Sequence, residues 1–359
     1  MLACILKNGK IEIAEKEKPR ASNDSAVIKV KAASICGTDL RTYKFGSNKI
    51  REGVTIGHEV CGEITEIGRN TEGFAKGDCV TVTPALGCGT CCVCRKGYSN
   101  MCDNLQTLGY QFDGSFAEYM EIPARFFANG HVNHVDPSVR PEQAALAEPV
   151  ACAINAQDFL NIQDGDYVAI FGSGFIGCIH AELAMAQKAS KVIMIEPNSD
   201  RLKIASKYIP SVYGITGNDV EASVRKITDG RGADVVIVAC SVGAAQEDAQ
   251  KIIAKRGRIS LFGGLPGEGK GFIDSNIIHY KELGVFGAHA STAVQNRKAL
   301  EWLAEGKIDT GKYIAGKYPL HNIMEAFKDL DEKGIMKAVI VDEGIASVTE
   351  KSGDFGSGK

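Results

Sequence analysis

The sequence predicts an α/β protein of two domains, one of them built around a doubly wound parallel sheet. A chain of 359 residues is longer than a single hydrophobic core usually supports. Its first part, to about residue 125, reads as short strands separated by glycine turns, whereas strand and helix patterns alternate from residue 165 onward. A glycine-rich turn at residues 171–177 follows the first strand of this second part and opens its first helix.

The elements of the first part follow from alternation and turn residues. Ala26–Ala33 alternates apolar and basic residues, as a half-buried strand does. Val60–Ile67 and Cys79–Thr83 predict two further strands, with turn residues between them. Pro141–Leu160 is apolar, rich in alanine and helical in its spacing, and its proline suits an early helical position.

In the second part, strands of about five to seven residues alternate with helices of about ten or more, the pattern of a parallel, doubly wound sheet. The expected strands are Tyr167–Phe171, Lys191–Glu196, Ser211–Ile215, Asp234–Cys240 and Arg258–Phe262. The expected helices are Ile176–Lys188, one from Ser199, one from Asp219, and Gly243–Lys255. About six strands are complete by Gly287, so we expect the following residues to return to the first domain.

This pattern divides the chain into two domains and a tail. Residues 1–155 and 291–343 are expected to form the first domain, which includes a cysteine-rich lobe at residues 87–102. Residues 156–290 are expected to form the second domain. Residues 344–359 are rich in serine, glycine and charge, which predicts a mobile tail.

Composition excludes several classes of function. The net charge of −3 and a pI near 6.2 leave no basic surface for nucleic acid, and no basic amphipathic run predicts membrane binding. No apolar run approaches the roughly 18 residues of a spanning helix, and early charged residues predict a first strand, not a signal peptide. Twelve cysteines in such a chain indicate the cytoplasm, where clustered cysteines bind metal or react more often than they pair.

The glycine-rich turn has the spacing of a dinucleotide-binding loop. Gly172, Gly174 and Gly177 form G-x-G-x-x-G, with Phe175 and Ile176 before the last glycine. The first glycine makes the turn, the second lets the backbone approach a pyrophosphate, and the third allows close helix–strand packing. The helix N-terminus adds an anion site. Placed between a strand and a helix, the motif predicts a Rossmann domain.

An acidic residue supports this assignment. Glu196 ends the next strand, about 20 residues further on, where a carboxylate hydrogen-bonds a free ribose diol and repels a 2′-phosphate. The sequence therefore predicts NAD in preference to NADP. Arg201 either flanks the adenine or is a solvated helix arginine. The structural alternative for the whole motif is a glycine-rich turn followed by a surface glutamate.

Four candidate metal ligands lie in three short segments: Cys36 in SICGTDL, His58 and Glu59 in IGHEV, and Glu148 in ALAEPVA. A dehydrogenase must stabilise negative charge on oxygen as hydride leaves carbon, and zinc does this as a Lewis acid. One thiolate, one imidazole and two carboxylates suit a catalytic zinc with an open position. Each residue alone has a structural alternative, as a core thiol, a buried histidine or a helix glutamate. Glu148 interrupts an apolar helix, where carboxylates are seldom left unpaired.

Five cysteines stand close together in residues 87–102, within the first part of the first domain. Cys88, Cys91, Cys94 and Cys102 have the spacing C-x2-C-x2-C-x7-C, which can close a tetrahedral structural zinc site. A reducing compartment disfavours a disulfide, and a redox dithiol would need free thiols. Cys92 lies outside this spacing and either packs as a small hydrophobic residue or competes for the metal.

Taken in order, CGTD, GHE, the four-cysteine segment, DGSFAEY (Asp113–Tyr119), AEP and GSGFIG resemble zinc-containing medium-chain dehydrogenases over about residues 1–343. The resemblance implies a GroES-like β-barrel catalytic domain, made from both ends of the chain, around a central Rossmann domain. It also implies one catalytic and one structural zinc per chain, NAD as cofactor, and a homodimer or homotetramer.

The third ligand position separates the branches of that superfamily. Typical alcohol dehydrogenases have a cysteine where this chain has Glu148, so the sequence is similar to the sorbitol, galactitol-phosphate and threonine dehydrogenase group. In that group Cys36 and His58 would bind zinc directly, while Glu59 and Glu148 would share or exchange the third position. Thr38 would pass on the hydroxyl proton. The reaction implied is hydride transfer from a secondary alcohol of a polyol or polyol phosphate to NAD, giving the ketose.

One departure from this group concerns the proton route. Threonine dehydrogenases and several polyol enzymes have a histidine shortly after the threonine, where this chain has Arg41 and its neighbours. Arginine cannot act as a general base near neutral pH, so the proton must leave through Glu59 or water. Arg41 either binds a substrate phosphate with two hydrogen bonds or is a surface arginine. Further pocket candidates, without a motif, are Tyr43, Phe112, Glu118 and His289.

Three other functions compete with this interpretation. The nearest is L-threonine 3-dehydrogenase-like oxidation of an amino alcohol. A non-catalytic zinc or nucleotide-sensing scaffold is disfavoured because the ligands, Thr38 and the glycine motif occur together. A zinc-ribbon nucleic-acid binder is disfavoured because its segment has only Arg95 and Lys96 as basic residues.

Overall fold

The computed structural model describes residues 1–265, 267 and 269–342, which divide into two compact units. Unit 1 comprises Met1–Glu148, Ser291–Ala304 and the chain from Asp309, and unit 2 comprises Pro149–Ala290 and Glu305–Ile308. The division falls within helix α5 (Ala147–Leu160), a few residues before the expected boundary. The expected mobile tail, residues 344–359, lies outside the described residues.

Unit 1 contains a mixed sheet whose strands come from both ends of the chain, in the order β16-β17-β3-β4-β5-β9, with β8 also paired to β3. Its strands are β3 (Ala26–Ser34), β4 (Glu59–Ile67), β5 (Cys79–Val82), β8 (Tyr119–Ile122), β9 (Val132–His134), β16 (Ile314–Pro319) and β17 (Lys337–Val341). Ser34 at the end of β3 lies opposite Glu59 on β4 and Val339 on β17. The C-terminal strand is therefore joined to the segment that carries the candidate zinc ligands.

Short hairpins and helices complete unit 1. β1 (Leu2–Lys7) and β2 (Lys10–Glu15) form a hairpin, and β6 (Ala85–Leu86) pairs with β7 (Gln106–Thr107) across the cysteine-rich segment. The helices are α1 (Gly37–Phe45), α2 (Cys92–Arg95), α3 (Ala124–Ala128), α4 (Pro141–Ala144), α11 (Ala293–Ala304) and α12 (Ile323–Lys328). Ile28 and Ile64 from the sheet share one buried core with Phe116, Phe126 and Phe327. The core thus ties the N-terminal strands to α12.

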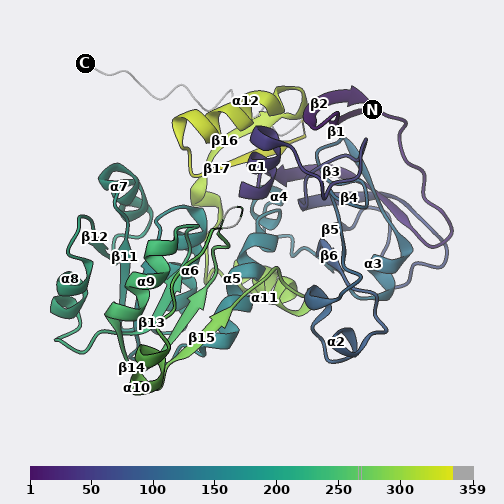
Figure 1. The fold of residues 1–359 in the computed structure, drawn as a ribbon. Helices are drawn as coiled ribbons and strands as arrows, with labels where there is room; N and C mark the ends of the chain where they lie inside the picture. Colours follow the sequence, from purple (N-terminus) through teal and green to yellow (C-terminus); the bar gives the residue numbers. More distant parts are fainter. Residues whose placement is uncertain (266, 268, 343–359) are drawn as a thin grey trace, which may run out of the picture. The chain divides into compact units, whose positions relative to one another are not determined.

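Unit 2 is a six-stranded parallel sheet in the order β12-β11-β10-β13-β14-β15 (Figure 1). The strands are β10 (Tyr167–Phe171), β11 (Lys191–Ile195), β12 (Tyr213–Ile215), β13 (Ala233–Val238), β14 (Ile253–Leu261) and β15 (Gly284–Gly287). The connecting helices are α6 (Phe175–Ala186), α7 (Ser199–Tyr208), α8 (Val220–Ile227), α9 (Gly243–Ile252) and α10 (Ser275–Lys281). The predicted doubly wound fold is confirmed. The strand order reverses beside β10, and such switch points bind ligands beyond the carboxyl ends of the strands.

Some predicted boundaries are wrong. The helix expected over Gly243–Lys255 ends at Ile252, because the next three residues already belong to β14. The helix expected over Pro141–Leu160 is divided into α4 and α5. Helix α1 was not expected at all within a part of the chain interpreted as strands.

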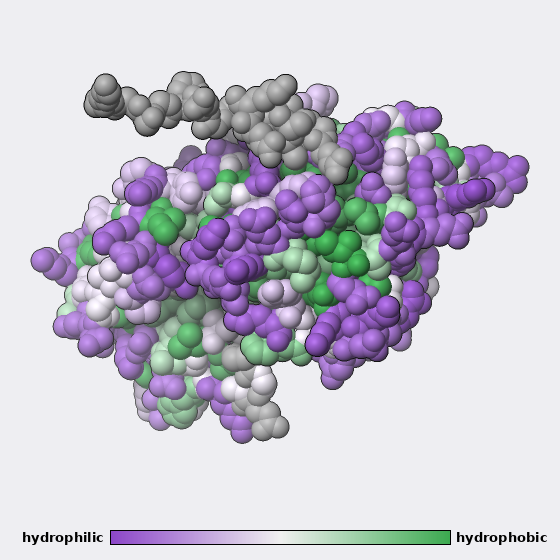
Figure 2. Space-filling model, turned by 90° about the horizontal axis from the view of Figure 1, so that it is seen from above, coloured by the Kyte–Doolittle hydropathy of each residue, from purple (hydrophilic) through white to green (hydrophobic). Residues whose placement is uncertain are grey.

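The surface is mostly polar in the view of Figure 2, where hydrophilic residues surround smaller hydrophobic areas. No helix within the described ranges has both the length and the apolar character that crossing a membrane requires.

Candidate active site

Three predicted metal ligands meet where β3 ends and β4 begins. Cys36 follows β3 after one residue and His58 directly precedes β4. Because β3 and β4 pair antiparallel with Ser34 opposite Glu59, the two strand ends lie side by side. Ligand atoms of Cys36, His58 and Glu59 all lie within 4.8 Å of one another.

The first turn of α1 orients two of these ligands. Oδ2 of Asp39 accepts a hydrogen bond from the backbone N–H of Cys36 at 2.9 Å. Oδ1 of the same carboxylate lies 3.6 Å from Nδ1 of His58. The Thr38 hydroxyl donates to Sγ of Cys36 at 3.0 Å. A carboxylate that faces a histidine ligand fixes the orientation of its ring, so Asp39 is a positioning residue that the sequence analysis did not identify.

Glu59 is fully buried and has two different oxygen environments. Its Oε2 accepts hydrogen bonds from Nζ of Lys337, at 2.7 Å, and from the Ser34 hydroxyl. Its Oε1 has no hydrogen-bond partner among the described residues. Lys337 is buried as well and also donates to the carbonyl of Ile35 at 2.8 Å. One carboxylate oxygen is therefore anchored, and the other remains open to a ligand.

The charges of this group fit a divalent cation. Burial raises the pKa of Glu59 to about 7, although the positive charge of Lys337 acts to lower it. The negative charge of Glu148 raises the pKa further. Burial opposes a charge on His58, but Asp39 and Cys36 outweigh it and raise the pKa of that imidazole. The pKa shift of Glu59 thus comes first from burial and then from the charge of Glu148, whereas that of His58 comes from the acidic groups of Asp39 and Cys36. Sulfur, nitrogen and oxygen donors together suit zinc, which would also provide a partner for Oε1 of Glu59.

Glu148 lies at the start of α5 and is not part of the group within 4.8 Å. Its charge nevertheless acts on Glu59, which places the two carboxylates in the same neighbourhood. That the two glutamates share one ligand position stays a prediction.

The predicted four-cysteine lobe is also assembled. One ligand atom from each of Cys88, Cys91, Cys94 and Cys102 lies within 4.8 Å of the others. Backbone N–H groups point at the sulfurs, with Cys91 N donating to Cys88 Sγ and Cys88 N to Cys102 Sγ, both at 3.3 Å. A hydrogen bond from Thr90 lowers the pKa of Cys88 to about 6. Four thiolates held in this way fit a closed, structural zinc site.

Cys92 is exposed at the first position of α2 and is not in this group. The interpretation of Cys92 as a packed hydrophobic residue is therefore wrong. The N-terminus of α2 instead uses Cys91, whose sulfur accepts from the N–H of Cys94 at 3.5 Å.

In unit 2, the glycine-rich turn connects β10 to α6, and each glycine has a geometric reason. Gly172 has φ +102°, a conformation that other residues rarely adopt. A Cβ on Gly177 would lie 2.0 Å from the carbonyl oxygen of Gly172. A Cβ on Gly174 would meet only Nη2 of Arg201 among the described residues, at 3.2 Å. These features match a loop that a pyrophosphate can approach. The loop lies at the N-terminus of α6, whose first two residues are Phe175 and Ile176.

Glu196 lies beside this loop. Its Oε2 accepts hydrogen bonds from the N–H and the hydroxyl of Ser173, both at 3.1 Å. Oε1 accepts from the N–H of Asn198 at 3.1 Å, and Nε of Arg201 lies 3.9 Å from the carboxylate. Glu196 thus places a negative charge next to the glycine turn, and the guanidinium of Arg201 covers the same turn.

The four further pocket candidates have other contacts. Tyr43 stacks on Phe327 with a centroid distance of 4.9 Å. Phe112 packs edge-on against Phe126, at 5.4 Å, in the core of unit 1. Glu118 accepts from the N–H of Leu2 at 2.7 Å, and His289 is an exposed residue of unit 2.

Tyr110 is a better candidate within unit 1, although it stands in no motif. Its ring lies edge-on to that of His58 at a centroid distance of 6.4 Å, and its hydroxyl interacts with the hydroxyl of Thr38. The sequence signal was limited to an aromatic residue three positions before the DGSFAEY segment.

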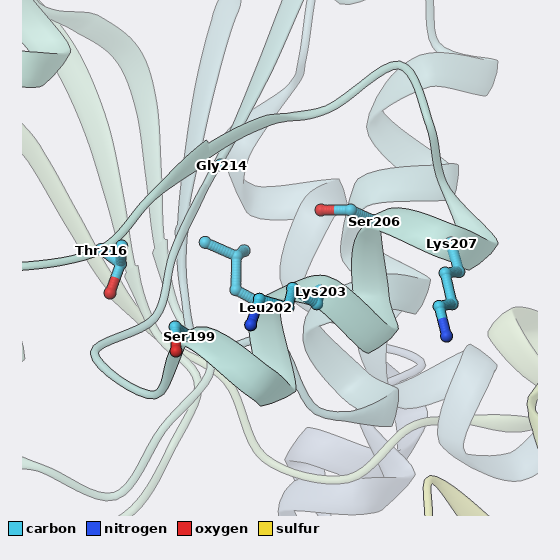
Figure 3. Close-up of a pocket in the computed structure, with 7 residues that line it drawn as sticks. All are labelled: Ser199, Leu202, Lys203, Ser206, Lys207, Gly214 and Thr216. Atoms are coloured by element: carbon cyan, nitrogen blue, oxygen red, sulfur yellow. The ribbon is translucent and has the colours of Figure 1, made fainter.

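A surface hollow of about 580 Å³ lies elsewhere in unit 2. Figure 3 shows that α7 supplies most of its lining and that β12 and Thr216 supply the rest. None of its residues belongs to the groups described above. Lys203, one of its cations, is already paired with Asp200 at 3.0 Å, so we assign it no function.

Two family models match the chain. The alcohol dehydrogenase GroES-like domain matches residues 22–131, which include Cys36, His58, Glu59 and the cysteine lobe. The zinc-binding dehydrogenase model matches residues 176–305. Both candidate metal groups thus lie, apart from Glu148, within the first match.

Known proteins resemble the chain over most of its length. L-threonine 3-dehydrogenase of Pyrococcus horikoshii is 34% identical over 314 residues, covering 86% of this chain and 88% of that protein. Sorbitol dehydrogenase of Halalkalibacterium halodurans is 31% identical over 336 residues, with coverages of 92% and 96%. The crystal structure of a zinc-binding dehydrogenase from Sinorhizobium meliloti 1021, bound to NADP, is 28% identical with a TM-score of 0.86, and the match covers 95% of this chain and 99% of that one.

Proposed function

Because the chain belongs to the family of zinc-containing medium-chain alcohol dehydrogenases, we propose that it oxidises a secondary alcohol of a polyol or polyol phosphate to the ketose with NAD. It is an oxidoreductase that uses zinc and a nicotinamide cofactor. The observation that supports the finer proposal is the nearness of Glu148 to Glu59, on which its charge acts, beside Cys36 and His58. We propose that this carboxylate shares the third ligand position.

We propose the following roles for residues of unit 1. Cys36 and His58 would hold the catalytic zinc, with Glu59 and Glu148 sharing the third position. When bound, zinc supplies Lewis acidity to the substrate oxygen, and the nicotinamide accepts the hydride. Thr38 would receive and pass on the hydroxyl proton, and its hydrogen bond to the sulfur of Cys36 supports this role. The four-cysteine lobe would hold a structural zinc, and its clustered thiolates suit a reducing compartment such as the cytoplasm.

The proposal of NAD over NADP rests on Glu196. Its carboxylate beside the glycine turn would accept a ribose hydroxyl and repel a 2′-phosphate, although one similar structure binds NADP. Glu196→Gln keeps an acceptor and removes the charge, so we expect the ratio of kcat/KM for NAD over NADP to fall at least tenfold. Asp200→Asn, an exposed neighbour on α7, is the matched control and should leave that ratio unchanged. An unchanged ratio in Glu196→Gln would refute this role.

The phosphorylated form of the substrate is supported by Arg41. It is exposed on α1, three residues after Thr38 and so on the same helix face. It has no ion-pair partner among the described residues. Arg41→Ala should raise KM for a polyol phosphate at least tenfold and leave KM for the free polyol within about twofold. Equal effects on both substrates would contradict a phosphate contact.

The test of the function is an NAD-reduction assay over sorbitol, xylitol, galactitol, their phosphates, L-threonine and simple alcohols, with metal analysis alongside. Turnover of a polyol or its phosphate, with about two zinc ions per chain, is the expected result. Absence of both zinc and turnover would contradict the proposal.

L-threonine oxidation is the second candidate, because threonine dehydrogenases are among the relatives at 34% identity. Against it stands Arg41 in the segment where those enzymes have a histidine. A kcat/KM for threonine that exceeds every polyol value would decide for this alternative.

A further inference from the structure

Two cysteines outside the zinc lobe form a close thiol pair between neighbouring strands. β4 and β5 pair antiparallel, with Cys61 opposite Thr81 and Glu63 opposite Cys79. Cys61 and Cys79 are therefore diagonal neighbours on one face of the sheet, where side chains are within reach of each other. Their sulfur atoms lie 3.3 Å apart.

The two thiols differ in access and in acidity. Cys61 is completely buried, whereas Cys79 is partly exposed at the start of β5. A hydrogen bond from Cys61 lowers the pKa of Cys79 against the effect of burial, and the ammonium group of Lys31 acts in the same direction. A partly exposed thiol whose pKa is lowered, in contact with a buried thiol, is the arrangement of an oxidation-sensitive pair.

The pair is close to the candidate zinc site along the same strand. Cys61 follows Glu59 by two residues, so both side chains stand on the same face of β4. Glu59 is held there by Lys337 and Ser34. A movement of β4 at Cys61 would therefore also move Glu59, one of the candidate zinc ligands.

We propose that Cys61 and Cys79 are a redox modification site. Hydrogen peroxide oxidises the two thiols to a disulfide, and this bond lowers the activity proposed above. The Cys79 thiolate attacks one peroxide oxygen, breaking the O–O bond and giving a sulfenic acid and, with a proton, water. The Cys61 thiol then attacks the sulfenic sulfur, the S–S bond forms and a second water leaves. Two thiols are oxidised and one peroxide is reduced to two waters.

The loss of activity follows from the geometry of the bond. Cysteines joined by a disulfide have Cα atoms about 4.4–6.8 Å apart, whereas diagonal neighbours in an antiparallel pair, such as Cys61 and Cys79, are about 7–8 Å apart. Closing the bond is therefore expected to draw β4 towards β5. The buried contacts of Glu59 depend on the present spacing and register of β3 and β4. The inhibitory part rests on the proposed function, whereas the bond itself does not.

The first experiment maps the bond in the zinc-loaded, full-length protein. After treatment with one to two equivalents of hydrogen peroxide, free thiols are alkylated and peptides are separated without reduction. We expect a linked pair of peptides containing Cys61 and Cys79, in most of the molecules, that dithiothreitol separates. The link should be absent from Cys79→Ser and retained in Cys92→Ser, which removes an exposed cysteine outside both groups. Alkylated Cys61 in the oxidised wild type, or Cys79 linked elsewhere, would overturn the proposal.

The second experiment follows kcat/KM on whichever alcohol the unmodified enzyme turns over. Oxidation should lower it at least fivefold, dithiothreitol should restore it, and Cys79→Ser should keep its activity under the same peroxide dose. A fully linked enzyme with unchanged kcat/KM would overturn the inhibitory part. Failure of the proposed function would appear separately, as no turnover before oxidation.

Discussion

At the scale of single residues, the candidate zinc site depends on a lysine that is remote in the chain. Lys337 is 5% exposed and Glu59 is 0% exposed, with Nζ and Oε2 2.7 Å apart. Burial favours the neutral amine of Lys337, but the charges of Glu59 and Cys36 raise the pKa of that group. The ammonium of Lys337 therefore favours the ionised form of Glu59, against the burial that raises the pKa of this carboxyl to about 7.

We predict that Lys337→Met destabilises the protein by about 3–5 kcal/mol, because removing one partner leaves a buried charge without compensation. The measurement is the free energy of urea unfolding at pH 7. Lys29→Met is the matched control, since the Lys29–Asp342 pair has the same 2.7 Å separation but lies at the surface. Such exposed pairs contribute about 0–1 kcal/mol. Equal losses in the two variants would show that Lys337 does not stabilise the site by charge.

The sequence predicted candidate ligands, three of which the structure brings together, but it did not predict their supporting residues. Cys36, His58 and Glu59 stand in short motifs whose residue types already indicate metal chemistry. Lys337 begins an apolar strand, KAVIV, 278 residues from Glu59, and nothing local distinguishes it from a surface lysine. Asp39 is within the CGTD motif, yet its role depends on how α1 turns, and this helix was not predicted.

At the scale of elements, the cysteine lobe is nearly self-contained. Its four sulfurs come from one continuous stretch, held by local N–H···S bonds such as that from Asn104 to Cys102 at 3.4 Å. Local spacing was therefore sufficient to predict its ligands. Only the place of Cys92 needed the structure, because exposure cannot be read from spacing.

We predict that Cys102→Ser removes one of two zinc ions per chain, because a hydroxyl is a much weaker zinc ligand than a thiolate. Cys92→Ser should retain both, as measured by elemental analysis after gel filtration. Loss of zinc from Cys92→Ser would mean that the fourth ligand is assigned incorrectly.

A buried histidine on helix α6 makes the stability of the protein depend on pH. His180 is completely buried on this helix, and burial lowers the pKa of the imidazole to about 3. The unfolded chain takes up this proton near pH 6.5. Between these values the unfolded state binds more protons, so stability falls as the pH falls.

His180→Leu should therefore reduce the stability lost between pH 7 and pH 5 by about 2 kcal/mol. Gln157, which faces the ring, keeps its hydrogen bond to the carbonyl of residue 180 at 2.9 Å. Urea-unfolding midpoints at both pH values give the measurement. His279→Leu, an exposed position in the same unit, should behave as the parent protein. If the two variants show the same slope, His180 is not the titrating group.

The bounds of helices and strands were predicted best where a buried apolar run is ended by clear turn residues. β10 was predicted to the residue, because an apolar run ends at a glycine turn. The predicted boundary between α9 and β14 was wrong because the short apolar run in KIIAK, residues 251–255, fits the end of a helix and the start of a strand equally well. Helix α1 contains few apolar residues and no helical stripe, so periodicity gave no signal.

At the scale of the whole molecule, the two units differ in what could be predicted. The parallel sheet of unit 2 follows from consecutive strand and helix patterns. The joining of β17 to β3 in unit 1 connects residues more than 300 positions apart, and only the resemblance to a family indicated it. No local pattern encodes which distant strands pair, because several apolar strands of similar length are available.

This division also predicts where the metal stabilises the chain. Every proposed ligand, from Cys36 to Glu148, belongs to unit 1, and metal binding contributes directly to the stability of the region that supplies the ligands. In the absence of NAD, a chelator should increase hydrogen–deuterium exchange in β3, β4 and the cysteine lobe at least tenfold. Exchange in β10, β11 and β13 should change less than twofold, because parts of a protein open independently when few interactions couple them. The matched control is the same chelator already saturated with zinc. Equal increases in both units would mean that zinc stabilises the chain as a whole and not through the ligands assigned to unit 1.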